Sequence, residues 1–172
     1  MILYIMRHAE AVERSETLPE EWRYLTGKGR LAAEQMSSAI AGSGPKPRLI
    51  LTSPLLRAVQ TAEIQAAKAC RKKELIVSAL LSPGADMDEL IACLTERKGA
   101  KRVMVVGHEP QLGALVTALL GRADGSITLK KGACVALELS SGRKPESSFL
   151  WYMTPGGKRI SSFKKAFPQK VR

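Results

Sequence analysis

The sequence is poor in aromatic residues and in cysteine. Only 5% of its 172 residues are Phe, Trp or Tyr, which argues against the aromatic platforms on which single-stranded nucleic acids stack. Its three cysteines, Cys70, Cys93 and Cys134, are widely spaced and form no Cys-x-x-Cys or Cys/His ligand pattern. That usage is typical of reduced thiols in a cytoplasmic protein rather than of a disulfide framework or a zinc site.

Long hydrophobic runs are also missing. The apolar run at the N-terminus, Met1–Met6, is too short for a signal peptide and has no basic segment before it. No stretch approaches the roughly 20 apolar residues that a membrane helix needs. We therefore expect a cytoplasmic protein with no membrane association.

Positive charge is in excess, with 27 Lys and Arg against 16 Asp and Glu and a formal net charge of +11. This balance favours anionic partners, such as phosphorylated substrates, acidic proteins, membrane surfaces or nucleic acid, without choosing among them. Residues 158–172 hold six basic side chains and no acidic one. We divide the chain into a domain at 1–157 and a basic C-terminal tail at 158–172, either a solvated tail or a docking segment for an acidic partner.

Short apolar runs alternate with segments of helical periodicity, which predicts an α/β protein with a mainly parallel, mixed sheet. Thr26, Ser53 and Asp86 are expected N-caps, with Pro54 as the first helical residue after Ser53. Residues 9–25 are expected to form a loop over the strand ends. The expected strands are 1–6, 48–52, 74–78 and 102–106, followed by a hairpin of 133–139 and 149–153; the expected helices are 26–42, 53–70, 86–97 and 111–120. The pattern predicts one three-layer α/β/α sandwich.

The two histidines of the chain both follow predicted strands. Arg7 and His8 end the first strand, and His108 follows the strand at 102–106. Arg57 comes one turn into the helix after Ser53. Because the carboxyl ends of parallel strands meet at one edge of a sheet, these four side chains could converge into an anion pocket with a histidine nucleophile.

A plainer interpretation stays open at this point. A histidine at a strand end is often a capping or core-rim residue, and an arginine after Ser-Pro is often a surface residue of a helix. No cluster of Asp, Glu or Cys suggests a metal, so we expect no metal and no cofactor. In a phosphate-handling site the arginines would then supply the positive charge that phosphoryl transfer requires.

Four motifs resemble those of the histidine phosphatase (phosphoglycerate mutase-like) superfamily. Residues 6–11, MRHAEA, resemble its Arg-His-Gly signature, with alanine where glycine is commonest. Residues 51–62, LTSPLLRAVQTA, and 106–110, VGHEP, resemble its second and third motifs, and 25–29, LTGKG, is also typical of it. The motifs occur in family order across nearly the whole chain. The resemblance implies the family's phosphoglycerate mutase-like sandwich.

The short chain and the ending Trp151–Pro155 are most similar to SixA-type phosphohistidine phosphatases. The resemblance implies that His8 attacks phosphorus and forms a phosphohistidine, which water then hydrolyses. Arg7, Arg57 and His108 would hold the phosphoryl oxygens. The implied partner is a phosphohistidine-bearing signalling protein, and we expect a monomer.

The proton donor to the leaving group is left open. Glu109 stands directly after the second histidine, and Asp86 follows a loop in the middle of the chain. Each also has a structural explanation, Glu109 at the start of a helix and Asp86 as a cap. Ser53, at a predicted helix start, is a further candidate contact for the phosphate.

Two rival functions also stay open. The first is a phosphatase of small phosphomonoesters, such as a sugar phosphate. The second is a non-catalytic module that binds phosphate or nucleic acid, suggested by the net charge of +11. The intact set of Arg7, His8, Arg57 and His108 argues against that module.

Overall fold

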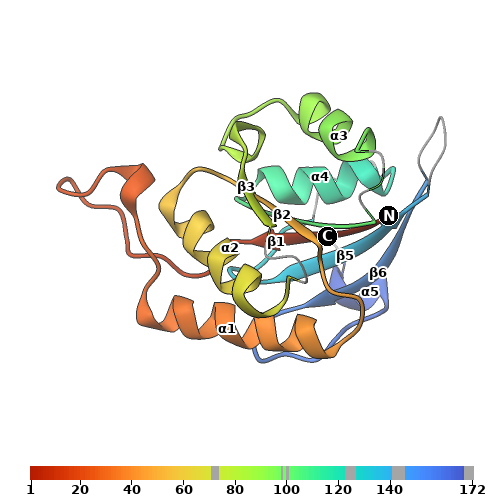
Figure 1. The fold of residues 1–172 in the computed structure, drawn as a ribbon, viewed down its shortest axis with the longest axis horizontal. Coiled ribbons are helices and arrows are strands. Elements are labelled where there is room, and N and C mark those ends of the chain that lie inside the picture. The colour runs from red at the N-terminus through yellow and green to blue at the C-terminus, as the bar shows by residue number, and fades with distance from the viewer. Residues whose placement is uncertain (71–73, 98, 100, 123–126, 141–145, 169–172) are drawn as a thin grey trace.

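A computed structural model describes residues 1–70, 74–97, 99, 101–122, 127–140 and 146–168, and shows one six-stranded sheet between layers of helices (Figure 1). The strand order is β3-β2-β4-β1-β5-β6. The strands are β1 (Ile2–Arg7), β2 (Leu49–Thr52), β3 (Glu74–Val77), β4 (Arg102–Gly107), β5 (Cys134–Leu139) and β6 (Ser147–Met153). The first four pair in parallel, and β5 pairs antiparallel with both β1 and β6. The predicted mainly parallel sheet with a closing hairpin is confirmed.

Two pairs of helices cover the two faces of the sheet. The helices are α1 (Gly27–Gly42), α2 (Leu56–Lys68), α3 (Met87–Thr95), α4 (Gln111–Leu119) and the short α5 (Phe163–Ala166), with 3₁₀ turns η1 (Glu20–Trp22) and η2 (Ala79–Leu81). In Figure 1, α1 and α2 lie below the sheet and α3 and α4 above it. This arrangement confirms the three-layer sandwich.

Alternation along the strands builds the two cores. In β1, Leu3 and Ile5 face the layer of α3 and α4, whereas Tyr4 and Met6 face α1 and α2. Successive strand residues point to opposite faces, so a central strand covered on both sides must be apolar at every position. All four of these residues are buried. The apolar run of β1 therefore places its first charged residues, Arg7 and His8, at the carboxyl edge.

The helix starts agree with the sequence in two cases out of three. Thr26 caps α1, where its hydroxyl accepts a hydrogen bond from Gly29 N–H at 2.9 Å, and Asp86 caps α3 through Glu89 N–H at 2.9 Å. The prediction that Ser53 caps α2 is wrong. That helix begins only at Leu56.

The Ser53 hydroxyl is occupied elsewhere, which explains the later start of α2. It bonds the ring of His108 and accepts a hydrogen bond from Leu55 N–H. Leu55 is the N-cap, with an extended backbone and no capping side chain. Pro54 therefore lies in a bend before the helix and not at its first position.

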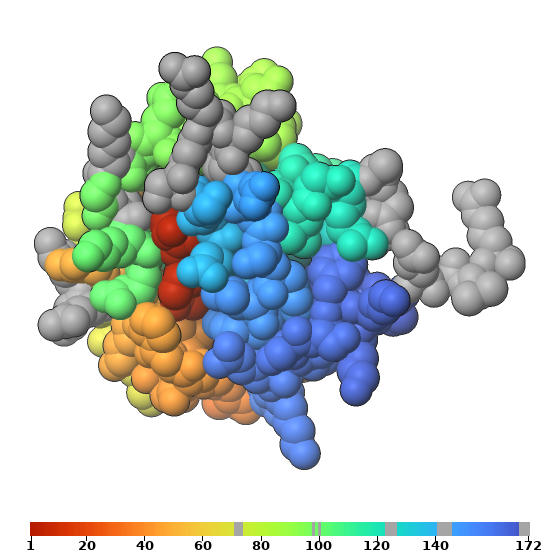
Figure 2. Space-filling view, turned by 90° about the vertical axis from the view of Figure 1, so that its right-hand side faces the viewer, coloured from red at the N-terminus to blue at the C-terminus, as the bar shows by residue number. Residues whose placement is uncertain are grey.

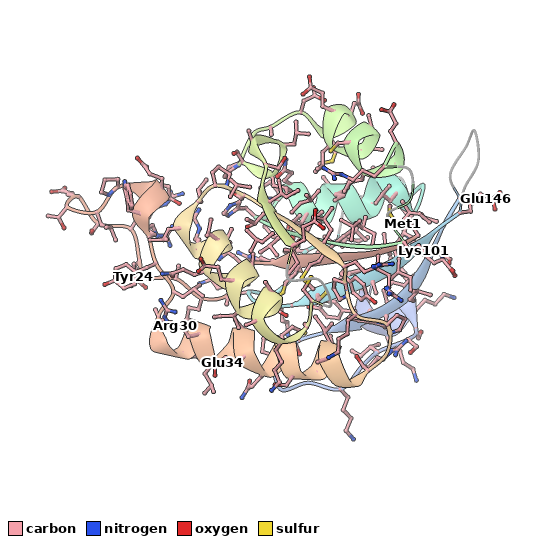
Figure 3. The ribbon with its side chains drawn as sticks, viewed as in Figure 1. Met1, Tyr24, Arg30, Glu34, Lys101 and Glu146 are labelled. Carbon is pink, nitrogen blue, oxygen red and sulfur yellow. The ribbon has the colours of Figure 1, made fainter. Side chains whose placement is uncertain are left out.

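Residues 9–25 form the expected loop at the carboxyl ends of the strands. It contains η1, and Ala11 and Leu25 close its base as an isolated antiparallel bridge. In Figure 3, Tyr24 lies at the opposite end of the molecule from Met1 and Lys101. Figure 2 shows that opposite end, where the first residues of the chain lie between the α1–β2 connection and the C-terminal strands.

Part of the basic C-terminal segment packs against the sheet. Ile160 exchanges two backbone hydrogen bonds of 2.9 Å with Tyr152 of β6. The rings of Phe163 and Phe167 pack against Phe149, with centroids 5.4 and 6.3 Å away. Residues 158–168 are thus attached to β6, and the division of the chain at residue 157 stays a prediction. Within the described ranges no helix is long and apolar enough to cross a membrane.

Gly29 gives a direct test of how α1 meets the loop. A Cβ atom at residue 29 would lie 2.0 Å from the carbonyl oxygen of Glu10, whereas a Cβ at Gly27 would meet nothing within 4 Å. We expect Gly29→Ala to lower the free energy of unfolding by roughly 1–3 kcal/mol, the usual cost of overpacking. Gly27→Ala is the matched control and should leave stability unchanged or raise it, since alanine favours helix. Urea unfolding followed by circular dichroism measures both, and equal stabilities for the two variants would contradict the packing described.

Candidate active site

The sheet brings three separate strand ends together. His8, Ser53 and His108 are each the first residue after a strand, and their strands β1, β2 and β4 are neighbours. His8 N–H donates to the carbonyl of Gly107, and Ser53 N–H donates to that of Val106, both at 3.0 Å. The rings of His8 and His108 lie 5.0 Å apart, centroid to centroid. The convergence expected from parallel strands is present.

The tautomer of His8 is fixed by its own neighbour. The Nδ1 atom lies 2.7 Å from the carbonyl oxygen of Ala9. A carbonyl only accepts hydrogen bonds, so Nδ1 carries the hydrogen and Nε2 carries the lone pair. Arg57 Nε donates to that Nε2 at 3.3 Å. A nucleophilic nitrogen therefore faces a guanidinium edge.

His108 is held from the adjacent strand end. Its Nε2 lies 2.8 Å from the hydroxyl oxygen of Ser53, which also accepts a bond from Leu55 N–H at 3.3 Å. That arrangement favours donation of the hydroxyl hydrogen to Nε2 and leaves the hydrogen of His108 on Nδ1. Ser53 thus orients a candidate phosphate ligand.

Both imidazoles are kept neutral. Burial lowers the pKa of His8 to about 4. The hydrogen bond to the Ala9 carbonyl raises the pKa, whereas the positive charges of Arg57, Arg7 and Arg23 lower it further. Burial also lowers the pKa of His108 to about 3, with further contributions from His8 and the guanidiniums of Arg57 and Arg7. At neutral pH His8 is consequently an uncharged imidazole amid positive charge, the form in which a histidine can act as a nucleophile.

Glu20 is a member of the site that the sequence did not reveal. Its carboxylate and its backbone carbonyl accept bonds from the two terminal nitrogens of Arg57, both at 2.9 Å. Burial opposes ionisation of Glu20, but Arg57 and Arg23 outweigh it and lower the pKa of the carboxyl. The only signal in the sequence was an acidic pair, Glu20 and Glu21, in the loop.

Arg7 is oriented through a backbone relay that ends on Glu109. Arg7 Nη1 donates to the carbonyl of Leu129 at 2.8 Å, and Leu129 N–H donates to Glu109 Oε1 at 3.0 Å. Burial raises the pKa of Glu109, while the amides of Leu129 and Gly113 and the charge of Arg7 oppose the shift. This site residue therefore anchors the backbone that positions Arg7.

Asp86 is placed differently from the other candidates. It is exposed, and its carboxylate bonds the first turn of α3. In the part of the chain that the structure describes, no hydrogen bond joins it to Arg7, His8, Arg57 or His108. The same part contains no group of three or more His, Cys, Asp and Glu placed to hold a metal ion.

Two buried nitrogens of the site make no hydrogen bond with the described chain, Arg7 Nε and His108 Nδ1. Buried donors usually have partners, and an unmade bond costs about 1–3 kcal/mol. Each of them is a donor that an oxygen of an anionic ligand could accept from. A phosphoryl group fits this requirement and the charge of the arginines.

The alanine at position 9 is accommodated by its surroundings. Ala9 is fully buried and packs with Leu25 and Ala33. Its N–H donates to the hydroxyl of Thr61 at 3.1 Å, and that hydroxyl donates to the carbonyl of Arg57 at 2.7 Å. The residue that departs from the usual Arg-His-Gly signature therefore helps to link β1 to α2.

A buried neutral histidine that accepts from an arginine lies at the carboxyl edge of an α/β sheet, an arrangement suited to a phosphoryl group. The model of the histidine phosphatase superfamily (branch 1) matches residues 3–81. The chain belongs to this superfamily.

Relatives extend the similarity over most of the chain. An uncharacterised protein of Picosynechococcus is 32% identical over 146 residues, covering 83% of this chain and 88% of its own length. The phosphohistidine phosphatase SixA of Escherichia coli is 29% identical over 158 residues, covering 90% of this chain and 94% of its own. A solved structure of the protein histidine phosphatase SixA, complexed with tungstate, is 26% identical with a TM-score of 0.82 and covers 91% of this chain and 98% of that one. The family and these similarities support a phosphatase.

The depressed pKa values can be measured directly. We expect proton NMR titration of the anion-free protein to place the His8 pKa near 4 and that of His108 near 3, below the ordinary 6.5. Inorganic phosphate should raise both values, because its negative charge favours the imidazolium. The His8→Asn variant assigns the two signals.

The same shifts predict how stability depends on pH. The unfolded chain binds a proton at each histidine near pH 6.5, whereas the folded protein resists protonation until about pH 4 or below. The free energy of unfolding should therefore fall as pH drops from 6.5 towards 4. Ordinary pKa values for both histidines without an anion would contradict the buried, cationic site.

Proposed function

We propose that this protein is a metal-independent phosphatase that acts through a covalent phosphohistidine at His8 and removes phosphate from histidine on a signalling protein. The observation that carries the proposal is the contact of His8 with two neighbours. The Ala9 carbonyl holds the hydrogen on Nδ1, and Arg57 faces the free Nε2. A nucleophile and a phosphate ligand are therefore adjacent before any substrate binds.

In the first step, the lone pair of His8 Nε2 attacks phosphorus opposite the leaving group. A P–N bond to His8 forms as the bond to the leaving group breaks, and the leaving group departs with that electron pair and takes up a proton. In the second step, water attacks the same phosphorus, gives up a proton, and releases inorganic phosphate and neutral His8. The hydrogen stays on Nδ1 and is donated to the Ala9 carbonyl oxygen, which stabilises positive charge on the ring of the intermediate.

Positive charge stabilises the transition state. Phosphoryl transfer depends mainly on positioning and on compensation of charge at the equatorial oxygens. Arg57 would contribute through Nε and Arg7 through its unbonded Nε, and the Nδ1–H of His108 would add a donor. The arginines would take the part that a metal ion takes in other phosphatases.

The leaving group decides how much a proton donor is needed. Glu109 has its Oε1 on the Leu129 amide, and Asp86 caps α3. Each carboxyl therefore already has a structural role. An imidazole leaving group is good once protonated, so a phosphohistidine substrate places the smallest demand on an enzyme acid. This argument and the similarity to SixA favour phosphohistidine over the small phosphomonoesters, the second candidate substrate class.

The surface around the site suits a protein substrate. Trp22 and Tyr24 are 59% and 48% exposed and lie on the loop whose Glu20 touches Arg57. Large exposed aromatic side chains are frequent anchors of protein interfaces. A phosphorylated protein is therefore the partner that we propose. Tungstate bound to the SixA of known structure is consistent with an oxyanion pocket in this fold.

A paired hydrolysis assay tests the function. Wild type and His8→Ala each receive a phosphohistidine protein and a panel of small phosphate esters, with and without a chelator. We expect wild type to prefer the phosphohistidine protein. The turnover number of His8→Ala should be lower by about a thousandfold or more, because the covalent nucleophile is lost. Circular dichroism checks that the variant is folded.

The results of this assay test the nucleophile, the substrate class and the independence from metal separately. Turnover retained by a folded His8→Ala protein would contradict the nucleophile. A wild-type preference for small esters would keep the chemistry and overturn the phosphohistidine substrate. Loss of wild-type activity on adding the chelator would contradict independence from metal.

A further inference from the structure

Arg57 already holds an anion that belongs to the protein itself. Its Nη2 donates to Glu20 Oε1 and its Nη1 to the Glu20 backbone carbonyl, both at 2.9 Å, while Nε faces His8 Nε2 at 3.3 Å. Arg57 is 4% exposed, so these contacts account for the three nitrogens of a buried guanidinium. A ligand at His8 Nε2 must therefore share Arg57 with Glu20.

The two ligands share the charge and the N–H groups of one guanidinium. Arginine grips phosphate or carboxylate bidentately with two parallel N–H groups. Nε faces His8, whereas Nη1 and Nη2 each give one N–H to Glu20. A phosphoryl group above His8 would thus find Nε directed towards it, one N–H of Nη2 engaged by Glu20, and the charge of Arg57 already paired with a carboxylate.

We propose that Glu20 is a specificity-determining residue, an internal anion that competes with the phosphoryl oxygens for Arg57. This inference rests on the phosphatase function proposed above and deepens it. The competition lowers the affinity of the pocket for any ligand whose binding comes from the phosphoryl group alone. Inorganic phosphate and small phosphate esters are such ligands.

Glu20 also forms ion pairs with two other arginines. Arg23 Nη1 lies 2.9 and 3.1 Å from its two carboxylate oxygens, and Arg14 Nε lies 3.0 Å from Oε2. The Glu20 side chain is 39% exposed, whereas that of Arg57 is 5% exposed. Displacement from Arg57 would leave Glu20 paired and close to water, so a substrate can displace it at modest cost.

The location of Glu20 explains how a protein substrate would bind more tightly than a small phosphate ester. Glu20 opens η1, and the exposed Trp22 is at its other end. A phosphorylated protein that contacts this turn can add binding energy from the surface and shift Glu20 as its phosphoryl group reaches Arg57. A small ester has only its phosphoryl group with which to compete.

The test replaces the charge of Glu20 and keeps its shape. Glu20→Gln retains an oxygen that can accept from Arg57, so the guanidinium stays oriented while the competing charge is lost. We expect the Kd for inorganic phosphate, measured by calorimetry, to fall about tenfold, a shift of about 1.4 kcal/mol. The KM for a small phosphate ester should fall in parallel with little change in kcat, and kcat/KM for the phosphohistidine protein should change less.

Glu21→Gln is the matched control. Glu21 is the next residue, carries the same charge, is exposed and makes no hydrogen bond or ion pair with the described residues. Its substitution should change the phosphate Kd less than about twofold, because exposed, distant charges are screened. An equal effect of both variants would overturn the specific contact and leave only general electrostatics.

Arg57→Ala separates this inference from the function on which it rests. Phosphate should bind weakly to Arg57→Ala, and adding Glu20→Gln to that background should have no further effect, as a double-mutant cycle measures. Wild-type phosphate affinity that does not depend on Arg57 would contradict the phosphate pocket itself. Affinity that depends on Arg57 but is unchanged or weaker in Glu20→Gln would overturn the competition and leave Glu20 as a support for Arg57.

Discussion

The structure depends on a neutral imidazole placed among guanidinium groups. His8 is 8% exposed, and the charges of Arg7, Arg23 and Arg57 all lower its pKa. Burial alone would keep the ring neutral, and the arginines add positive charge that attracts an anion. The bond from Nδ1 to the Ala9 carbonyl then decides which nitrogen is free. The same few residues thus supply an uncharged imidazole, the nucleophile that we propose, and the positive charge around it.

The fold lowers the free-energy cost of burying these polar and charged groups. Parallel pairing of β1 with β4 and of β4 with β2 brings three strand ends to one edge, and α1–α4 keep both faces of the sheet dry. The cationic side chains are supported by backbone carbonyls and carboxylates, since Arg7 bonds Leu129 and Arg57 bonds Glu20. These supports reduce the cost of burying positive charge without occupying the nucleophilic nitrogen.

Much of this could be predicted from the sequence, because the informative features are local. Apolar runs that stop at Arg7-His8 and before His108 predict strands that end at polar residues, and parallel strands bring such ends together. The start of α2 could not be predicted in this way. Ser53 and Pro54 have the local preference of a helix start, but the bond of Ser53 to His108 outweighs it, and that bond exists only in the folded sheet.

Glu20 was missed for a similar reason. Its partner is 37 positions along the chain, and nothing in an acidic loop distinguishes one glutamate from its neighbours. Glu109 was singled out as a candidate proton donor, and its contact with the Leu129 amide depends on a segment 20 positions away. The sequence identifies side chains that could act in the site. The orientation of each side chain depends on residues that are distant in the sequence.

The most direct test of the account is to trap the covalent intermediate that we propose and to identify its linkage. The enzyme is mixed with a phosphohistidine protein, quenched in alkali within milliseconds, digested, and mapped by mass spectrometry with a standard for each phosphohistidine isomer. The account predicts phosphate on Nε2 of His8, because Nδ1 is held by the Ala9 carbonyl. Phosphate on Nδ1, on His108, or on no histidine during active turnover would contradict it.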